Sequence, residues 1–124
     1  MKILIVDDES YIRMLIEQTL EDLEDEGVDI LTASNGEEAV EVIEAEEPNL
    51  VFLDVMMPKM NGFDVCRKVK KELGLEHVYI VMLTAKGQEF DKQKGDEVGA
   101  DLYMTKPFDP DDLYDKAEEV LGLA

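Results

Sequence analysis

Residues 50–54 read Leu-Val-Phe-Leu-Asp, an uninterrupted apolar run that ends in a carboxylate. The same arrangement, an apolar run followed directly by a polar or charged group, recurs at Asp7 and Asp8 after residues 3–6, at Thr84 after residues 78–83, and at Lys106 after residues 102–105. Runs that lack polar alternation are typical of strands covered on both faces of a sheet. If these runs are parallel strands, their polar ends meet at one edge of one sheet.

The segments between the apolar runs have helical periodicity. A further run at residues 28–33 completes the set of expected strands. Apolar residues three or four positions apart mark amphipathic helices at residues 12–23, 39–43, 63–73 and 113–120. Strands and helices therefore alternate along the chain, which predicts an α/β fold with a parallel sheet and right-handed crossovers.

Two sets of residues indicate where helices begin. Ser34 with Glu37 reads as a capping box. Asp109-Pro110 reads as an N-cap followed by a proline at the first helical position. Both signals fall just after an expected strand, as a βα connection requires.

The helix expected between residues 86 and 98 is weakly specified. A helix is needed there to connect two parallel strands, but Phe90 and Val98 are its only large apolar anchors. Gly95 also lies in its interior, where glycine costs about 1 kcal/mol relative to alanine. We therefore expect this helix to be marginal.

Length and composition limit the function classes. The chain has 124 residues, 45% of them hydrophobic, which is ordinary for one globular domain with a buried core. Its net charge of −19 repels nucleic acid and anionic lipid, so we expect no direct binding to either. No apolar stretch approaches the roughly 18 residues of a membrane span, and the single Cys66 cannot form an internal disulfide. We expect a cytoplasmic location.

Three carboxylates gathered at one sheet edge require a proton or a cation. At 4 Å and an effective dielectric near 20, Asp7, Asp8 and Asp54 would repel by about 4 kcal/mol per pair. Hard oxygen ligands with room for water suit Mg²⁺, which would leave Asp54 able to attack phosphorus as a nucleophile. Lys106 can pair with phosphoryl oxygens, and Thr84 can donate a hydrogen bond to one. The pattern predicts magnesium-assisted phosphoryl transfer to Asp54.

Each of these groups alone has an ordinary explanation, as a turn acid, a strand end or a surface lysine. Their joint position on four strand ends favours a site. The other conspicuous side chains are interpreted as structural: Met56, Met57 and Met60 as loop and core filler, His77 as a surface residue, Cys66 as a small core residue and Gly62 as a turn residue.

Four segments together resemble a known family. They are Val-Asp-Asp-Glu at residues 6–9, Leu-Asp-Val-Met-Met-Pro-Lys-Met-Asn-Gly at residues 53–62, Leu-Thr-Ala-Lys at residues 83–86 and Gly-Ala-Asp-Leu-Tyr-Met-Thr-Lys-Pro-Phe at residues 99–108. In this order they resemble the receiver domain of bacterial and archaeal response regulators, over essentially the whole chain. The resemblance implies one receiver domain at residues 1–124. It also implies a doubly wound (βα)5 sandwich with a five-stranded parallel sheet of order 2-1-3-4-5 and helices on both faces.

The resemblance also implies a function for the acidic residues. Asp54 would accept a phosphoryl group from the phosphohistidine of a sensor histidine kinase or a histidine phosphotransfer protein. Mg²⁺ would be held by Asp8, Asp54 and the backbone carbonyl of Met56, with Asp7 in support through water. The domain would be a signalling switch of a two-component system that transfers phosphoryl groups only to and from itself.

The remaining implied residues concern the switch. Thr84 and Lys106 would take the family's hydroxyl and lysine roles, and Tyr103 stands where the family places its switch aromatic. Lys106-Pro107 resembles the family's cis-proline junction. Phosphorylation would change the face that binds a downstream output protein or domain.

The chain departs from the family pattern in two places. Asn61 stands where relatives often carry aspartate, and this change is expected to be harmless. Gly95 and Asp96 stand where many relatives place small and large apolar residues. The second departure affects the packing of the helix expected at residues 86–98.

Two rival interpretations are weighed against the switch. A magnesium-dependent phosphatase of the haloacid dehalogenase class also forms an aspartyl-phosphate, but it requires a second acid two residues after its nucleophile, where this chain has Met56. A degenerate receiver would bind partners without phosphate, and the presence of the site's acids, hydroxyl and lysine argues against it. Residues 121–124 lie where the last helix should stop, which is compatible with a stand-alone receiver and with an excised one.

Overall fold

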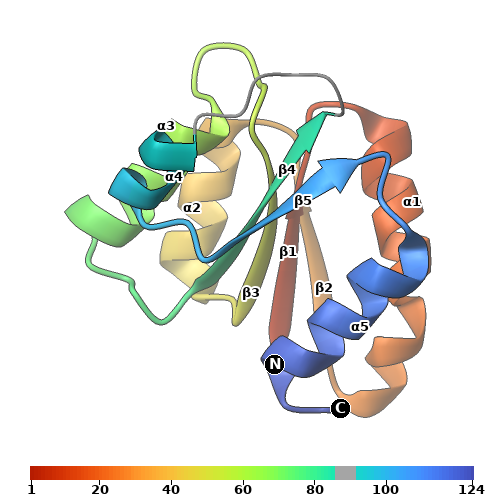
Figure 1. Cartoon of the computed structure of the whole chain (residues 1–124). Coiled ribbons are helices and arrows are strands. Elements are labelled where there is room, and N and C mark those ends of the chain that lie inside the picture. The colour runs from red at the N-terminus through yellow and green to blue at the C-terminus, as the bar shows by residue number, and fades with distance from the viewer. Residues whose placement is uncertain (86–91) are drawn as a thin grey trace.

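Five parallel strands form the centre of the molecule, in the order β2-β1-β3-β4-β5 (Figure 1). The computed structural model describes residues 1–85 and 92–124. The strands are β1 (Lys2–Val6), β2 (Asp29–Ala33), β3 (Leu50–Asp54), β4 (Tyr79–Ala85) and β5 (Leu102–Lys106). The predicted α/β class and the strand order implied by the resemblance are therefore confirmed.

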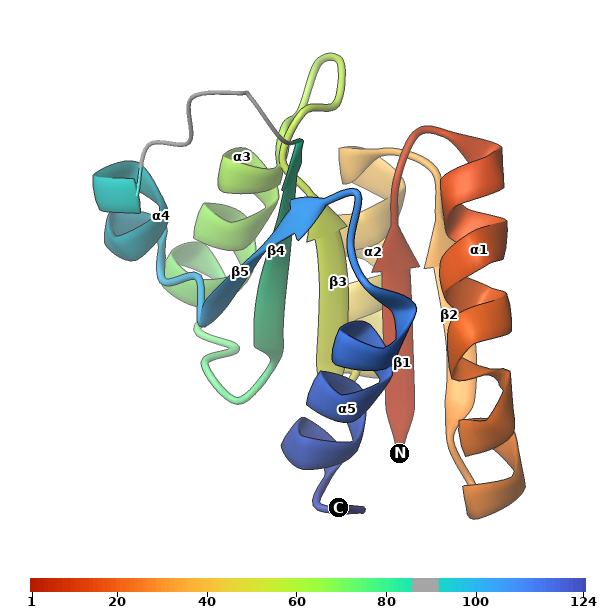
Figure 2. The same cartoon turned by 45° about the vertical axis from the view of Figure 1, so that its right-hand side comes forward.

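Helices cover both faces of this sheet (Figure 2). The helical elements are α1 (Ser10–Leu20), the 3₁₀ helix η1 (Glu21–Glu26), α2 (Gly36–Glu46), α3 (Gly62–Arg67), the π-helical turn η2 (Lys68–Glu72), α4 (Lys92–Val98) and α5 (Pro110–Leu121). Helices α1 and α5 lie on one face, and α2, α3 and α4 lie on the other (Figure 2). No helix among the described residues is long and apolar enough to cross a membrane.

The sheet separates two hydrophobic cores because successive strand residues point to opposite faces. On β3, Val51 and Leu53 pack toward α2 and α3, while Leu50 and Phe52 pack toward α1 and α5. All four side chains are fully buried. This double coverage explains why the strand reads as an unbroken apolar run, and it holds the end of the strand in a fixed position.

One of the two predicted helix starts is confirmed and the other is shifted. Asp109 caps α5 by accepting a hydrogen bond from the backbone amide of Asp111 at 2.9 Å, and Pro110 is the first helical residue, as predicted. The predicted Ser34–Glu37 capping box is wrong by one residue. Asn35 is the N-cap of α2, and its Oδ1 accepts from the amide of Glu38 at 2.8 Å.

The first turn of α2 shows why the start moved. The Ser34 hydroxyl donates to the Glu38 carboxylate at 3.1 Å, so this side chain is engaged with a helical residue and does not cap the backbone. Asn35 takes the extended backbone conformation that an N-cap needs.

Helix α1 differs from the expectation at one residue, and α4 is described over only part of the expected helix. In α1 the buried residues are Ile16 and Leu20. Leu15, an apolar residue of the predicted amphipathic segment 12–23, is 42% exposed because it lies one position, or about 100°, around the helix from Ile16. Helix α4 is present over Lys92–Val98, and Val98 is buried as expected. The other expected anchor, Phe90, lies outside the described residues.

Gly62 allows the start of α3 to approach the end of β3. Its amide donates to the carbonyl of Val55 at 2.8 Å. A Cβ at this position would lie 2.6 Å from the backbone oxygen of Asp54, closer than real Cβ atoms come to other atoms. The turn predicted at Gly62 is therefore a tight contact that fixes the loop between Asp54 and α3.

Replacing Gly62 with alanine should lower the free energy of unfolding by about 3 kcal/mol, the upper part of the range for overpacking, because the opposed backbone oxygen cannot rotate away. Gly74→Ala is the control, since its Cβ would meet open space and only its φ of 67° is unfavourable, at about 1 kcal/mol. Urea unfolding of both variants tests this. If both variants lose the same free energy of unfolding, the close approach of residue 62 to the Asp54 backbone is not what makes Gly62→Ala unfavourable.

Candidate functional site

The carboxyl ends of β1, β3, β4 and β5 lie along one edge of the sheet, at the top of Figure 2. Asp7 follows β1 directly, Asp54 is the last residue of β3, Thr84 is the next to last of β4, and Lys106 is the last of β5. Because β3 pairs with both β1 and β4, these groups converge on the end of the central strand.

Asp7, Asp8 and Asp54 form an acidic cluster in which one carboxylate oxygen from each residue lies within 4.8 Å of the other two. Asp7 is fully buried and Asp54 is 5% exposed, while Asp8 faces solvent. The cluster thus has two inner carboxylates and one at its open side. Three hard oxygen donors with access to water fit the ligand preference of Mg²⁺, which keeps part of its hydration shell in protein sites.

Lys106 bridges the two inner carboxylates. Its Nζ lies 2.6 Å from Oδ2 of Asp7 and 3.2 Å from Oδ1 of Asp54. Burial lowers the pKa of the Lys106 ammonium, but the hydrogen bond to Asp7 and the charges of Asp54 and Asp7 outweigh it, so the pKa is raised overall. Lys106 therefore stays charged and links β5 to β1 and β3.

One ammonium does not neutralise this cluster. Burial and the neighbouring charge of Asp7 raise the pKa of Asp54 from 3.8 to about 6. The charge of Lys106 and the hydrogen bond from the Met56 amide, 3.3 Å from Oδ1, act in the opposite direction and are outweighed. Ionisation of the buried Asp54 carboxyl group therefore costs free energy, and a further cation nearby would reduce this cost.

Asp7 is fixed by two contacts that the sequence analysis missed. The amide of Glu9 donates to Oδ1 of Asp7 at 2.9 Å, and Nη1 of Arg13 donates to the backbone oxygen of Asp7 at 2.6 Å. Aspartate side chains often accept a hydrogen bond from the backbone amide two residues ahead, which forms an Asx-turn. The first contact could therefore have been predicted from the sequence. The Arg13 contact gives no such local signal.

Of the other predicted site residues, Thr84 and Met56 lie next to Asp54, whereas Tyr103 does not. Thr84 is 8% exposed and lies one residue beyond Leu83, which pairs with Asp54. Met56 is in the loop after β3, with its side chain 59% exposed. Tyr103 lies on β5 away from the acids, and its hydroxyl donates to Oδ1 of Asp96. The Lys106-Pro107 peptide bond is cis.

The residues that we interpreted as structural occupy ordinary positions. His77 is exposed and lies 2.9 Å from Glu47. Cys66 is fully buried on α3, where burial raises the pKa of its thiol to about 12. Met57 is buried and Met60 is partly buried against the same core. Neither His77 nor Cys66 belongs to the acidic cluster.

Comparison with known proteins identifies the family of this chain. The family model described as the response regulator receiver domain matches residues 3–118. The chain belongs to the response regulator receiver domain family. It is therefore a receiver of two-component signalling, and the phosphatase alternative is not favoured.

Individual receivers and receiver-containing proteins are similar over nearly the whole chain. The alkaline phosphatase synthesis transcriptional regulatory protein PhoP of Bacillus subtilis is 47% identical over 120 residues, which are 97% of this chain and 48% of PhoP. The structure of Vibrio cholerae chemotaxis protein CheY4 has a TM-score of 0.83 and 34% identity, covering 96% of this chain and 97% of CheY4. The BeF3-activated DrrB receiver domain has a TM-score of 0.79 and 31% identity, covering 98% and 97%. The chain spans about half the length of the curated relatives it matches, 48% for PhoP.

The pKa of Asp54 predicts how the stability of the metal-free receiver depends on pH. The folded state binds this proton more tightly than the unfolded state, so stability falls as pH rises from about 4 through about 6. Asp54→Asn cannot ionise. The free energy of unfolding of Asp54→Asn should therefore exceed that of wild type by an amount that grows with pH. The difference should be near zero at pH 4 and as much as about 3 kcal/mol at pH 7, at 1.36 kcal/mol per pKa unit.

Urea unfolding in EDTA at several pH values measures this difference. Glu24→Gln, which removes one charge from an exposed position on η1, is the control and should show no comparable growth. If the free energy of unfolding of wild type rises relative to that of Asp54→Asn as pH increases, the raised pKa of Asp54 is contradicted.

Proposed function

We propose that residues 1–124 form one receiver domain in which Asp54 accepts the phosphoryl group. The observation that carries this proposal is the Lys106 bridge between Asp7 and Asp54 inside a cluster of three carboxylates. The bridge supplies a fixed cation beside a buried nucleophile, and the third carboxylate, that of Asp8, is exposed to solvent. This arrangement suits an incoming phosphoryl group, whose negative charge needs cations on both sides.

The proposed metal ligands are the Asp8 and Asp54 carboxylates and the backbone carbonyl of Met56, with Asp7 acting through water. When bound, Mg²⁺ would neutralise the charge that the acids and the phosphoryl oxygens bring together. Asp7 suits the supporting role because its carboxylate is already engaged by Lys106 and by the Glu9 amide.

The proposed chemical step is a transfer between two nucleophiles. An oxygen of the Asp54 carboxylate attacks phosphorus of a phosphohistidine, the P–N bond breaks, and the imidazole nitrogen keeps the electron pair and takes up a proton. Lys106 is placed to pair with a phosphoryl oxygen and Thr84 to donate a hydrogen bond to another. Loss of the phosphoryl group is a second substitution at phosphorus: water attacks, the P–O bond to Asp54 breaks, and inorganic phosphate and a proton are released, which regenerates the carboxylate.

The proposed phosphodonor is a sensor histidine kinase or a histidine phosphotransfer protein. The helix after Asp7 and Asp8 presents exposed apolar side chains at Tyr11, Met14 and Leu15, which are 65%, 58% and 42% exposed. Exposed apolar groups beside a polar site are typical of protein-binding surfaces. A protein donor can cover this surface while its phosphohistidine reaches Asp54.

The proposed output is a change in the face that binds a downstream protein or domain. PhoP is described as a transcriptional regulatory protein, and this chain matches 48% of it. A transcription-regulating partner or domain is therefore a reasonable recipient of the signal. Direct nucleic-acid contact by the receiver itself is disfavoured by its net charge of −19.

Incubation with acetyl phosphate and Mg²⁺ should add one phosphoryl group to the wild-type chain and none to Asp54→Asn. Intact mass spectrometry measures the addition, and borohydride reduction of the acyl phosphate followed by peptide mapping identifies the residue. Asp25→Asn, on exposed η1, is the control and should be phosphorylated normally. Full phosphorylation of Asp54→Asn would overturn the acceptor, and rapid turnover of many phosphate esters would favour the phosphatase.

Mg²⁺ should stabilise the folded receiver, because the acidic cluster exists only in the folded state. At 100 times its dissociation constant the expected gain is about 2.7 kcal/mol. Asp8→Ala should remove most of this gain, whereas Asp25→Ala should keep it. Thermal unfolding with and without Mg²⁺ tests both variants, and an unchanged response of Asp8→Ala would place the cation elsewhere.

A further inference from the structure

Asp96 and Tyr103 connect α4 to β5 through their side chains. The Tyr103 hydroxyl donates a hydrogen bond to Oδ1 of Asp96. Asp96 is an exposed residue of α4, and Tyr103 packs partly buried against the core that includes α3. The contact therefore joins a helix at the surface to the edge strand of the sheet, and it needs both the phenol and the carboxylate.

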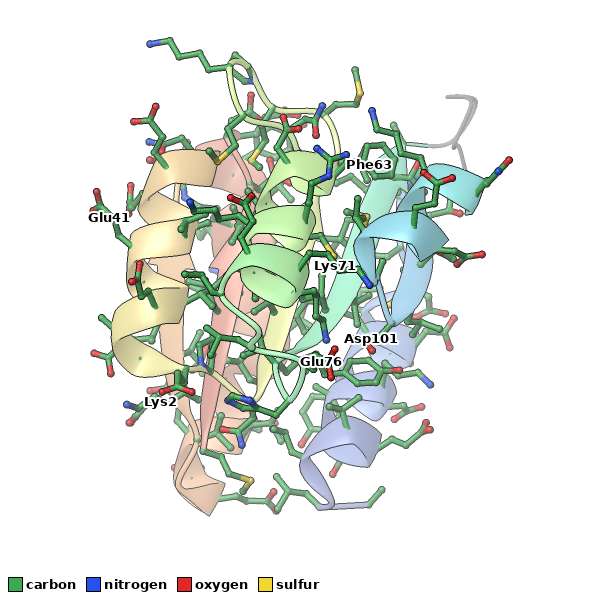
Figure 3. All side chains as sticks on the ribbon, turned by 90° about the vertical axis from the view of Figure 1, so that its left-hand side faces the viewer. Lys2, Glu41, Phe63, Lys71, Glu76 and Asp101 are labelled. Atoms are coloured by element: carbon green, nitrogen blue, oxygen red, sulfur yellow. The ribbon has the colours of Figure 1, made fainter. Side chains whose placement is uncertain are left out.

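The end of α4 is held independently of this contact. The Cys66 thiol of α3 donates to the backbone oxygen of Val98 at 3.3 Å. Just beyond the helix, Asp101 lies 2.9 Å from Nζ of Lys70, a buried lysine of η2. Figure 3 shows Asp101 beside Glu76 below α4, and the Lys70 ammonium also donates to the Glu76 backbone oxygen at 2.9 Å.

The outer part of α4 also contacts α3. Nζ of Lys94 lies 5.0 Å from the centre of the Phe63 ring, within the range of a cation–π interaction. Figure 3 shows Phe63 at the side of α3 that faces α4. Helix α4 is therefore attached to α3 near both ends, and Asp96 lies between these attachments with its carboxylate turned to β5.

The environment of the Tyr103 hydroxyl favours its protonated form, which is the form that donates to Asp96. Burial, followed by the hydrogen bond to Asp96 and its negative charge, raises the pKa of Tyr103 to about 12. A hydroxyl that donates to a carboxylate forms a charge-assisted hydrogen bond, which is stronger than a bond between neutral groups. Any conformation that moves Tyr103 away from α4 must break it.

We propose that Asp96 is a positioning residue that holds Tyr103 against α4 in the unphosphorylated receiver and so opposes activation. The inference rests on the proposed function, and it takes the region around Tyr103, which stands at the family's switch position, to be part of the face that phosphorylation of Asp54 changes. A contact made in only one of two conformations shifts the equilibrium by its full free energy. Removing the Asp96 carboxylate should therefore make the activated conformation easier to reach.

Beryllofluoride, the group named for the activated DrrB receiver, is the probe because it occupies a phosphoryl site without covalent turnover. Isothermal titration calorimetry in saturating Mg²⁺ gives its dissociation constant. Asp96→Ala should bind beryllofluoride about three to ten times more tightly than wild type, given the usual strength of a partly exposed hydrogen bond to a carboxylate. Asp96→Asn keeps an acceptor oxygen and should stay closer to wild type.

Glu97→Ala is the matched control, because it removes the same charge from the next, exposed position of α4. Its affinity should stay within about twofold of wild type, as expected for a surface substitution. Tyr103→Phe lacks the hydroxyl and should tighten binding as Asp96→Ala does. The double variant Asp96→Ala/Tyr103→Phe should bind no more tightly than either single variant, because both changes remove the same contact.

Three results would overturn the proposal while leaving the proposed function intact: wild-type affinity in Asp96→Ala, equal tightening in Glu97→Ala, or additive tightening in the double variant. No binding of beryllofluoride by wild type would instead overturn the proposed function and, with it, the regulatory role of Asp96. The contact itself is tested separately by the same double-mutant cycle in urea unfolding, where additive losses would show that Asp96 and Tyr103 do not interact.

Discussion

The mutual repulsion of Asp7, Asp8 and Asp54 is the constraint on which the rest of the site depends. The fold holds one carboxylate oxygen of each within 4.8 Å of the other two because apolar strands buried on both faces fix the ends of β1 and β3. Burial and the neighbouring charge of Asp7 raise the pKa of Asp54 to about 6, although the charge of Lys106 acts in the opposite direction. A bound cation would reduce this cost of ionising Asp54, so the proposed metal binding and the proposed phosphoryl acceptance depend on the same cluster.

Much of this arrangement could be predicted from the sequence, because an apolar run that ends in a polar group identifies both a strand and its carboxyl end. Residues 50–53 were sufficient to locate β3 and to place Asp54 at its end. The same reasoning predicted that Lys106 lies beside the acids, although it follows Asp7 by 99 residues in the sequence. The order of the strands could not be derived from spacing, since several orders satisfy the same connections, and it came from the family resemblance.

The features that the sequence analysis did not predict depend on contacts made by individual side chains. Ser34 and Asn35 are both good N-caps, and only the engagement of Ser34 with Glu38 decides between them. The Arg13 contact with the backbone of Asp7 and the Asp96 contact with Tyr103 join different elements of the fold, so no local pattern predicts them. These contacts determine how firmly the site and its surroundings are held, whereas the strand ends determine where the site is.

A crystal structure of the receiver with Mg²⁺ and beryllofluoride tests the central claim most directly. The account predicts a Be–O bond to a carboxylate oxygen of Asp54, a metal ion in contact with Asp8 and Asp54, and the Lys106 ammonium within hydrogen-bond distance of a fluorine atom. Beryllofluoride bound at another residue, or a metal ion bound away from the three aspartates, would contradict it.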